Sequence, residues 1–315
     1  MAAPFSAPVP REGILAALWL PTDLEGNLLV RELAANLAFL KKHGVHGVLA
    51  LGSTGEFPQF DLKQRKRALE TVAELAAPLP VIANVSDIRP HAVTELGRFA
   101  RKIGLPAIAI MAPGFYPSSQ EDMLAHFLHA ADASALPTFL YNFPELTGTR
   151  INLETVTEFA ERARMAGIKQ SGGEFAYHAE LVRLGREKNF VVFSGADTRL
   201  PEVLGLGAVG CIGGLVNIAP DLMVHLYRVC REGAPGDINP TFERLREIAR
   251  IIDRLTFPLN VAAGMEARGL AAGEPKAIVS PRSRAVYLEI VAELRSRFAQ
   301  WQIDPTSSPS SADGS

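Results

Sequence analysis

Residues 28–56, LLVRELAANLAFLKKHGVHGVLALGSTGE, hold the pattern that decides the fold class. Residues 28–44 have apolar side chains at helical spacing, and this segment ends at a glycine. Residues 46–51 then form a short apolar run, and GSTGE at 52–56 follows as a turn. A run that is apolar throughout, rather than at every second position, predicts a strand covered on both faces, as in the parallel sheet of an α/β protein.

The same alternation of helix and strand continues along the chain. Stretches with helical period, such as residues 61–76, lie between the apolar runs. Eight β/α units within about 200 residues predict a closed (β/α)8 TIM barrel, and an open doubly wound sheet is the alternative. The other seven strand candidates are residues 14–20, 80–85, 106–111, 137–142, 166–170, 190–195 and 208–213.

The strand signals stop after residue 220, which predicts a barrel over residues 11–220 and a C-terminal helical domain over residues 221–302. Residues 1–10 are expected to be a flexible N-terminus, and the low-complexity residues 303–315 a disordered tail. The helical patterns of the C-terminal domain cover residues 221–232, 239–255, 258–271 and 281–300.

Composition and charge exclude several classes of protein. The chain has 315 residues, of which 48% are hydrophobic and 21% are charged, as in an ordinary globular protein. A net charge of −2 gives no basic footprint for nucleic acid. No apolar run is long enough to span a membrane, and the proline-containing N-terminus does not resemble a signal peptide. Cys211 and Cys230 are too few for a disulfide framework, so we expect a soluble, cytoplasmic protein.

In a barrel of this kind the active site forms at the C-terminal ends of the strands. Lys169 ends the sixth apolar run, in AGIKQSGGE (166–174), where a lysine is unusual. Burial favours the neutral amine, which attacks a carbonyl and forms a Schiff base. A lysine that only reaches solvent or pairs with a carboxylate is the alternative.

Two further strand ends offer partners for this lysine. Tyr141 ends the fifth run and can transfer protons to a forming carbinolamine, although it can equally be a packed ring. In the turn GSTGE, Gly52, Ser53 and Thr54 offer backbone amides and two hydroxyls that suit a small carboxylate. The alternative for this stretch is a plain βα turn.

GSTGE, YNFPELTG (141–148) and AGIKQSGGE, in this order, resemble the dihydrodipicolinate synthase/N-acetylneuraminate lyase family over about residues 11–300. The resemblance implies a (β/α)8 barrel with a helical C-terminal domain. It also implies a metal-free aldolase that binds pyruvate as a Schiff base, usually as a homotetramer. By position, Lys169 would form the Schiff base, Tyr141 would transfer protons, and Ser53 and Thr54 would hold the pyruvate carboxylate. The backbone around Ile212 would line the pyruvate pocket.

The departures from the family pattern bear on the second substrate. Where the synthases have an arginine that grips aspartate semialdehyde, this chain has Leu146. Phe115, beside Tyr116, occupies the position of a tyrosine that completes a proton relay across their dimer interface. The sugar-reading Asp-Glu pair of the lyases is Asp197 and Thr198 here, and their following serine is a glycine. These differences favour a substrate shorter than a sialic acid. YNFPELTG looks most like the motif of 2-keto-3-deoxy sugar acid aldolases, and KQSGGE is similar to that of 4-hydroxy-2-oxo acid aldolases, so the resemblance implies one of these substrate classes.

We therefore predict a lyase that makes or breaks a C–C bond next to pyruvate, acting on pyruvate and an aldehyde as a homotetramer or dimer. Dihydrodipicolinate synthase and a non-catalytic 2-keto acid sensor are the alternatives. No cofactor and no metal are expected, because the resemblance implies a metal-free aldolase that works through a covalent Schiff base. His126 and His129 in HFLH (126–129) could bind a metal, but they should lie outside the barrel, and no carboxylate follows at ligand spacing. The predicted catalytic residues are Lys169, Tyr141 and Thr54, and the predicted substrate-binding residues are Gly52, Ser53, Thr54, Gly195, Asp197, Thr198 and Ile212.

Overall fold

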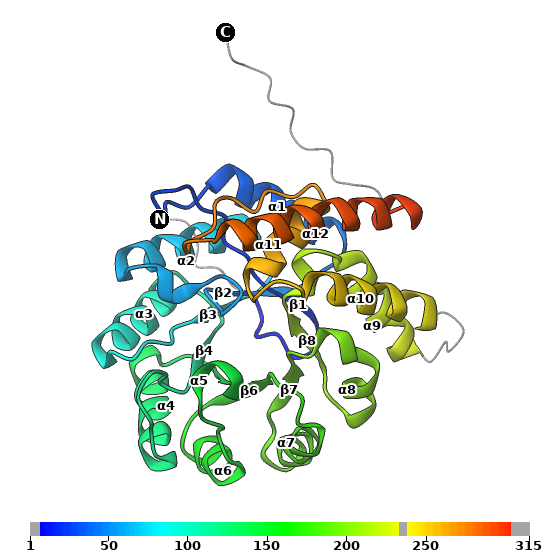
Figure 1. The fold of residues 1–315 in the computed structure, drawn as a ribbon. Coiled ribbons are helices and arrows are strands. Elements are labelled where there is room, and N and C mark those ends of the chain that lie inside the picture. Colours follow the sequence, from blue (N-terminus) through cyan, green and yellow to red (C-terminus); the bar gives the residue numbers. More distant parts are fainter. Residues whose placement is uncertain (1–6, 233–237, 304–315) are drawn as a thin grey trace.

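Eight parallel strands close into a barrel in sequence order, and the first strand pairs with the last to complete the ring (Figure 1). The structure is a computed structural model that describes residues 7–232 and 238–303. Closure confirms the predicted barrel and excludes the open doubly wound sheet. The strands are β1 Gly13–Ala17, β2 Gly47–Ala50, β3 Val81–Asn84, β4 Ala107–Met111, β5 Thr138–Asn142, β6 Met165–Gln170, β7 Val191–Ser194 and β8 Gly210–Gly213.

Helices surround this barrel and follow the strands in turn (Figure 1). The sequence also marks where helices begin. The Asp61 side chain accepts a hydrogen bond from the backbone N–H of Gln64, the Gln64 side chain accepts one from the backbone N–H of Asp61, and this capping box begins α2. The helices are α1 Val30–Lys42, α2 Leu62–Ala76, α3 Pro90–Lys102, α4 Gln120–Ser134, the short α5 Pro144–Thr147, α6 Leu153–Arg162, α7 Phe175–Lys188, α8 Leu200–Leu206 and α9 Pro220–Glu232.

Three more helices complete the described chain, namely α10 Ile238–Ile252, α11 Leu259–Ala267 and α12 Pro281–Gln300. Figure 1 shows α11 and α12 lying across the side of the barrel that carries β1 and β2. The domain division at residue 220 stays a prediction, and α9, just beyond it, packs against β1. Residues 1–6 of the expected flexible N-terminus and residues 304–315 of the expected tail lie outside the described residues.

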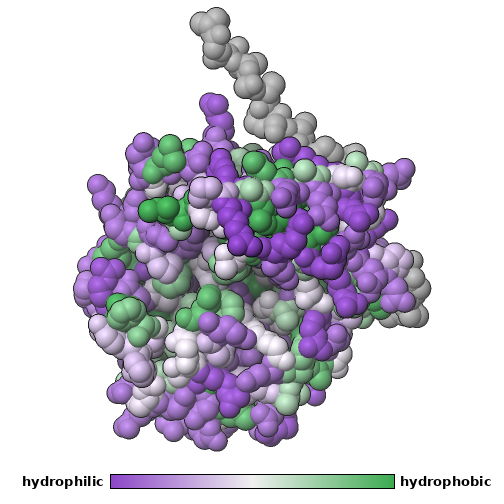
Figure 2. Space-filling view, in the orientation of Figure 1, coloured by the Kyte–Doolittle hydropathy of each residue, from purple (hydrophilic) through white to green (hydrophobic). Residues whose placement is uncertain are grey.

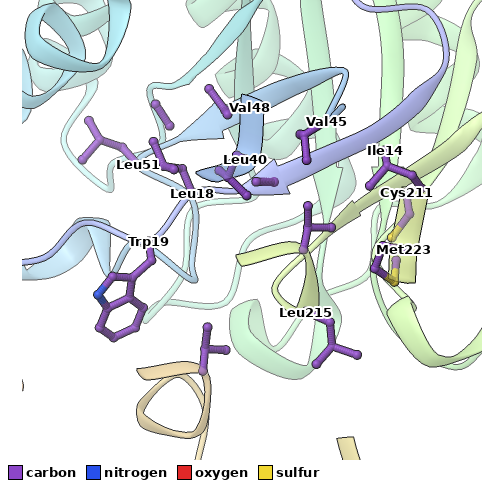
Figure 3. Packing of buried hydrophobic residues seen from close by; sticks show 14 of the residues in the cluster. Ile14, Leu18, Trp19, Leu40, Val45, Val48, Leu51, Cys211, Leu215 and Met223 are labelled. Carbon is purple, nitrogen blue, oxygen red and sulfur yellow. The ribbon is translucent and has the colours of Figure 1, made fainter. Parts of the chain in front are cut away.

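The continuous apolar runs of the strands are explained by two separate cores. Ile14 packs outward against the helices, whereas its neighbour Leu15 points into the barrel, and both are fully buried. Cys211 and Ile212 on β8 divide in the same way. Figure 3 shows part of the outer core, in which Ile14 and Cys211 lie near Met223. Successive side chains of a strand therefore face two different apolar environments, so the residues of both orientations must be hydrophobic.

Buried hydrogen bonds join the C-terminal ends of β2, β3 and β4. The Asn84 side-chain amide donates to the Leu51 carbonyl over 2.6 Å, and the Ser86 hydroxyl donates to Asn84 Oδ1 over 2.6 Å. The same hydroxyl accepts from the backbone N–H of Met111 over 2.8 Å. This network fixes the point at which residues 52–56 leave β2.

Short 3-10 helices shape the same end of the barrel. They are η1 Phe57–Gln59 after β2, η2 Asp197–Arg199 after β7 and η3 Leu215–Asn217 after β8.

Within the two described ranges, no helix combines the length and apolar character needed to cross a membrane.

Candidate active site

Lys169 and Tyr141 lie side by side on neighbouring strands. They are register partners between β5 and β6, so their side chains leave the barrel wall on the same face. Lys169 is 5% exposed and Tyr141 is 1% exposed. The lysine Nζ donates to the tyrosine Oη over 3.0 Å and lies 4.2 Å from the centre of its ring. The two residues that the sequence predicted to act together are therefore in direct contact.

Ser53 extends this contact to the turn after β2. Its Oγ lies 2.8 Å from the Tyr141 Oη, and either oxygen can donate the hydrogen. The tyrosine hydroxyl thus stands between an amine and a second hydroxyl. Such a group accepts a proton from one neighbour while it donates its own to the other, which is the arrangement that proton transfer requires.

Thr54 and Gly52 complete the turn on which Ser53 lies. Thr54 is buried, and its Oγ1 faces the start of η3, because a Cβ placed on Gly214 would lie 3.6 Å from it. The Gly52 carbonyl accepts a hydrogen bond from the backbone N–H of Phe57 over 3.4 Å, which closes the turn. The turn therefore spans from Tyr141 on one side to the β8 end of the barrel on the other.

Ile212 and Gly195 lie where the sequence placed them, at the ends of β8 and β7. Ile212 is buried inside the barrel with Tyr141 and Phe193. The backbone N–H of Gly195 donates to the Gln170 carbonyl over 2.8 Å, so this residue borders the residue that follows Lys169.

Asp197 is engaged by the protein itself. Its carboxylate accepts from the backbone N–H of Leu215 over 3.1 Å and from the Cys211 thiol over 3.3 Å. Burial raises the pKa of this carboxyl above its ordinary value, against the opposite effect of these hydrogen bonds and of Lys169. Gly213 makes room for it, since a Cβ there would fall 1.4 Å from Asp197 Oδ1. The oxygens of Asp197 therefore already accept hydrogen bonds from the protein. Substrate contacts by Asp197 and by the adjacent Thr198 stay predictions.

A cavity of about 590 Å³ opens beside Ser53 at the mouth of the barrel. Its walls are mainly apolar and include Phe57, Met111, Phe115 and Leu146. In the same orientation as Figure 1, the space-filling view shows a hollowed face with apolar residues at its rim (Figure 2). Phe115 is 87% exposed and stands edge to face against Tyr116, with ring centres 4.8 Å apart. Lys169 and Tyr141 do not line this cavity, which is connected to them through the hydrogen bond between Ser53 and Tyr141.

The sequence reasoning missed several polar residues around this cavity. Arg65 is 1% exposed, and its guanidinium bonds to Asp87 over 3.1 Å and to the Ser86 carbonyl over 3.0 Å. Glu56, also on the cavity wall, pairs with Lys276 over 2.9 Å. Arg65 sits in a charge run typical of a solvated helix face, and Lys276 is in a loop far along the chain, so no local signal marks either residue.

The two histidines of HFLH have different surroundings. The His129 Nε2 lies 2.8 Å from the Thr94 hydroxyl at the surface, while burial lowers the pKa of His126 to about 4. Among the residues that the structure describes, His, Cys, Asp and Glu form no group of three or more that could hold a metal ion.

The sequence profile of the dihydrodipicolinate synthetase family matches residues 10–296, nearly the whole described chain. The chain belongs to this family. A 4-hydroxy-tetrahydrodipicolinate synthase from Methanosphaerula palustris is 30% identical over 265 residues, which is 83% of this chain and 91% of that protein. The synthase of the same name from Gluconacetobacter diazotrophicus is 30% identical over 238 residues, covering 75% of this chain and 80% of the relative.

Solved structures show the same architecture. YagE, a prophage protein of the dihydrodipicolinic acid synthase family from E. coli K12 solved in complex with pyruvate, matches with a TM-score of 0.84 and 26% identity. The match covers 93% of this chain and 99% of YagE. CdNal from Clostridium difficile, solved with mannosamine, matches in fold with a TM-score of 0.82 at 20% identity, over 91% of this chain and all of the other. Membership of the dihydrodipicolinate synthetase family makes the protein a lyase of the class I pyruvate aldolase type, which works through a Schiff base.

Proposed function

We propose that the protein makes or breaks a C–C bond next to pyruvate, with Lys169 as the Schiff-base lysine and Tyr141 as the proton-transfer group. The observation that carries the proposal is the hydrogen-bonded line from the Lys169 amine through the Tyr141 hydroxyl to Ser53, with distances of 3.0 Å and 2.8 Å. This line ends in the turn whose hydroxyls and amides are suited to the pyruvate carboxylate.

The chemistry follows from these positions. The neutral Lys169 amine attacks the C2 carbonyl of pyruvate, and Tyr141 supplies a proton to the oxygen, which leaves as water when the imine forms. The protonated imine draws electrons from C3, so loss of a C3 proton gives an enamine. In the synthetic direction C3 of the enamine attacks the aldehyde carbonyl, the resulting alkoxide takes up a proton to become the new hydroxyl, and hydrolysis of the imine releases the 2-oxo acid product. Cleavage is the same path in reverse, and hydrolysis of the imine releases pyruvate.

Ser53 and Thr54 are proposed to hold the pyruvate carboxylate, with the backbone amides of the turn at Gly52. Ser53 reaches the Tyr141 hydroxyl, and Thr54 is buried and faces the β8 end of the barrel. Hydrogen bonds to a carboxylate are charge-assisted and stronger than neutral ones, so a pair of hydroxyls with turn amides suffices for a small anion.

For the second substrate we propose a neutral, hydroxylated aldehyde, so that its condensation product with pyruvate is a 2-keto-3-deoxy sugar acid or a 4-hydroxy-2-oxo acid. Leu146 brings an apolar side chain to the cavity where the synthases have arginine. Arg150, the nearest cation in sequence, is held by Glu174 over 2.7 Å at the surface. A second carboxylate would therefore lack a free cation from this segment.

The dihydrodipicolinate synthase reaction, with aspartate semialdehyde as the second substrate, is the second candidate. It is favoured by the relatives at 30% identity, which are named 4-hydroxy-tetrahydrodipicolinate synthases. A non-catalytic 2-keto acid sensor is the third. The contact between Lys169 and Tyr141 argues against a sensor, because simple binding of a 2-keto acid requires neither residue.

We also propose that the protein acts as a homotetramer or dimer in the cytoplasm, without a metal or other cofactor. The exposed rings of Phe115 and Tyr116, beside the cavity, support an interface between copies at this end of the barrel. Whether Tyr116 replaces the interface tyrosine that is absent at Phe115 is tested by Tyr116→Phe, which lowers turnover only if the relay exists.

Steady-state turnover on a panel of substrates tests the proposal. The panel contains 2-keto-3-deoxy sugar acids and short 4-hydroxy-2-oxo acids in the cleavage direction, and pyruvate with aspartate semialdehyde in the synthetic direction. Cleavage that releases pyruvate is expected for the first two classes. Efficient condensation with aspartate semialdehyde alone would make the protein a dihydrodipicolinate synthase, and binding without turnover would make it a sensor.

A further inference from the structure

The segment between α11 and α12 is fastened across the end of β1. We call residues 271–276 the strap. Its backbone N–H at Glu274 donates to the Thr22 carbonyl over 2.7 Å, and Gly273 forms a bridge with the same threonine. The Trp19 indole N–H donates to the Ala272 carbonyl over 2.7 Å. Figure 1 shows α11 and α12, the helices on either side of the strap, on this side of the barrel. Because Trp19 and Thr22 follow β1, these contacts place the strap at the C-terminal end of that strand.

The side chain of Lys276, at the end of the strap, is buried. Only 4% of its side chain is exposed, and its Nζ donates to Glu56 Oε2 over 2.9 Å, where the Glu56 side chain is 13% exposed. The ammonium also lies 4.4 Å from the ring centre of Trp19 and 5.9 Å from that of Phe60. Water screens a pair in such surroundings poorly, so removing one member leaves the charge of the other largely uncompensated.

Glu56 is the last residue of the turn that carries Ser53 and Thr54. Its backbone N–H donates to the Ser53 carbonyl over 3.0 Å, and it adopts a left-handed conformation with φ of 54°. Its side chain lines the same cavity as Ser53. The position and charge of Glu56 therefore affect the site where the carboxylate of the substrate is proposed to bind.

A bare carboxylate at position 56 would oppose this binding. Two negative charges repel each other, and the repulsion grows as water is excluded from between them. The strap places an ammonium on Glu56 from a part of the chain 220 residues away, which leaves the turn electrically neutral. Burying a charged ammonium among apolar side chains costs free energy, and a contact that only holds the loop in place would not require a lysine here.

We propose that Lys276 is a positioning residue that neutralises and fixes Glu56, and so enables the turn at residues 52–56 to bind the carboxylate of a 2-oxo acid. The inference rests on the proposed function, because the carboxylate in question is that of pyruvate held by Ser53 and Thr54. Lys276 acts through Glu56 and does not itself react with the substrate.

The test measures how borohydride labelling of the purified enzyme depends on pyruvate concentration. The variants are Lys276→Met, which keeps length without charge, Glu56→Gln, and the two combined. Lys66→Met is the matched control, because it removes a lysine from an ion pair at the surface, the 2.5 Å contact with Glu95. Thermal unfolding is recorded for each variant, and peptide mapping locates the label.

A charge-based role predicts opposite signs for the two single variants. Lys276→Met should raise the half-saturating pyruvate concentration about tenfold while the maximal label on Lys169 is unchanged, since one uncompensated charge then faces the substrate carboxylate. Glu56→Gln should leave the concentration unchanged or lower it. The double variant should return to within about threefold of the wild type, because no net charge is left. Lys66→Met should match the wild type.

Two results would overturn the inference. One is a half-saturating concentration in Lys276→Met that stays within about twofold of the wild type, because an uncompensated charge must weaken binding by more. The other is a rise in Glu56→Gln as large as that in Lys276→Met, which would mean that the pair is merely structural. If Lys276→Met does not fold, the half-saturating pyruvate concentration of Glu56→Gln decides, and a rise in that concentration overturns the inference. Absence of label on Lys169 in the wild type would overturn the proposed function, and this inference with it.

Discussion

Replacing Tyr141 by phenylalanine removes one oxygen atom from the centre of the proposed site. That oxygen lies 3.0 Å from the Lys169 Nζ and 2.8 Å from the Ser53 Oγ. The ring that remains is 1% exposed and packs near Phe143, with ring centres 6.2 Å apart. The shape of the core is therefore kept, and only the hydroxyl and its two hydrogen bonds are lost.

The magnitudes separate the effect on stability from the effect on catalysis. Two hydrogen bonds contribute about 1–3 kcal/mol to the free energy of unfolding, at roughly 0.5–1.5 kcal/mol each. Loss of a general acid–base group slows the chemical step by about 10²–10⁴-fold, or roughly 3–5 kcal/mol of barrier. We therefore expect Tyr141→Phe to fold, to unfold at a moderately lower temperature, and to lose turnover by about 100-fold or more.

The assay compares steady-state turnover and thermal unfolding of Tyr141→Phe with those of Tyr177→Phe. Tyr177 is a matched control, because it is also buried and its hydroxyl also hydrogen-bonds, to the Ile151 carbonyl, but it lies on α7 away from Lys169. The control should lose stability and keep turnover. Turnover of Tyr141→Phe within a factor of a few of the wild type would refute the reasoning, and Tyr116 would then be the next candidate for proton transfer.

The other predictions concern substrate choice, backbone space and pH. Sugar-acid cleavage should exceed condensation with aspartate semialdehyde by about 100-fold, and Leu146→Arg should narrow this gap by supplying a cation, as kcat/KM on both substrates will show. Gly213→Ala should lower the unfolding temperature and the activity, because its Cβ would fall 1.4 Å from Asp197 Oδ1; Gly205→Ala, which meets open space, should do neither. Burial lowers the pKa of His178 from 6.5 to about 4. Between these two pH values the histidine is protonated in the unfolded chain but neutral in the folded chain. The free energy of unfolding should therefore fall as the pH drops from about 6.5 to about 4. Urea unfolding of the wild type and His178→Leu across this range should show the wild type losing more stability than the variant.

The barrel could be predicted from the sequence because each of its strands faces two apolar environments. Ile14 and Leu15 must both be hydrophobic, so the run stands out without an alignment. The end of the first strand was less visible. The apolar run continues to residue 20, but β1 stops at Ala17. The backbone N–H of Trp19 donates to the Asn217 side chain over 3.0 Å instead of to a neighbouring strand. That partner lies 198 residues away and leaves no local mark.

The same distinction applies to the site. Lys169 and Tyr141 could be paired from the sequence because parallel strand ends share one rim, and the registry of β5 and β6 makes them neighbours. The orientation of Asp197 could not, since its strand end is visible in the sequence but its hydrogen bond to Leu215 is not. The ion pair of Lys276 with Glu56 depends on how the C-terminal helices dock, and no periodicity reports docking.

The proposed mechanism depends on the formation of an imine between Lys169 and pyruvate. It is tested most directly by adding borohydride to the folded enzyme with saturating pyruvate and mapping the reduced adduct by mass spectrometry. We expect one adduct, on the peptide that contains Lys169, and none on the peptide that contains Lys276, whose side chain is also buried. An unmodified Lys169 in folded protein at saturating pyruvate, or an adduct on Lys276 in its place, would contradict it.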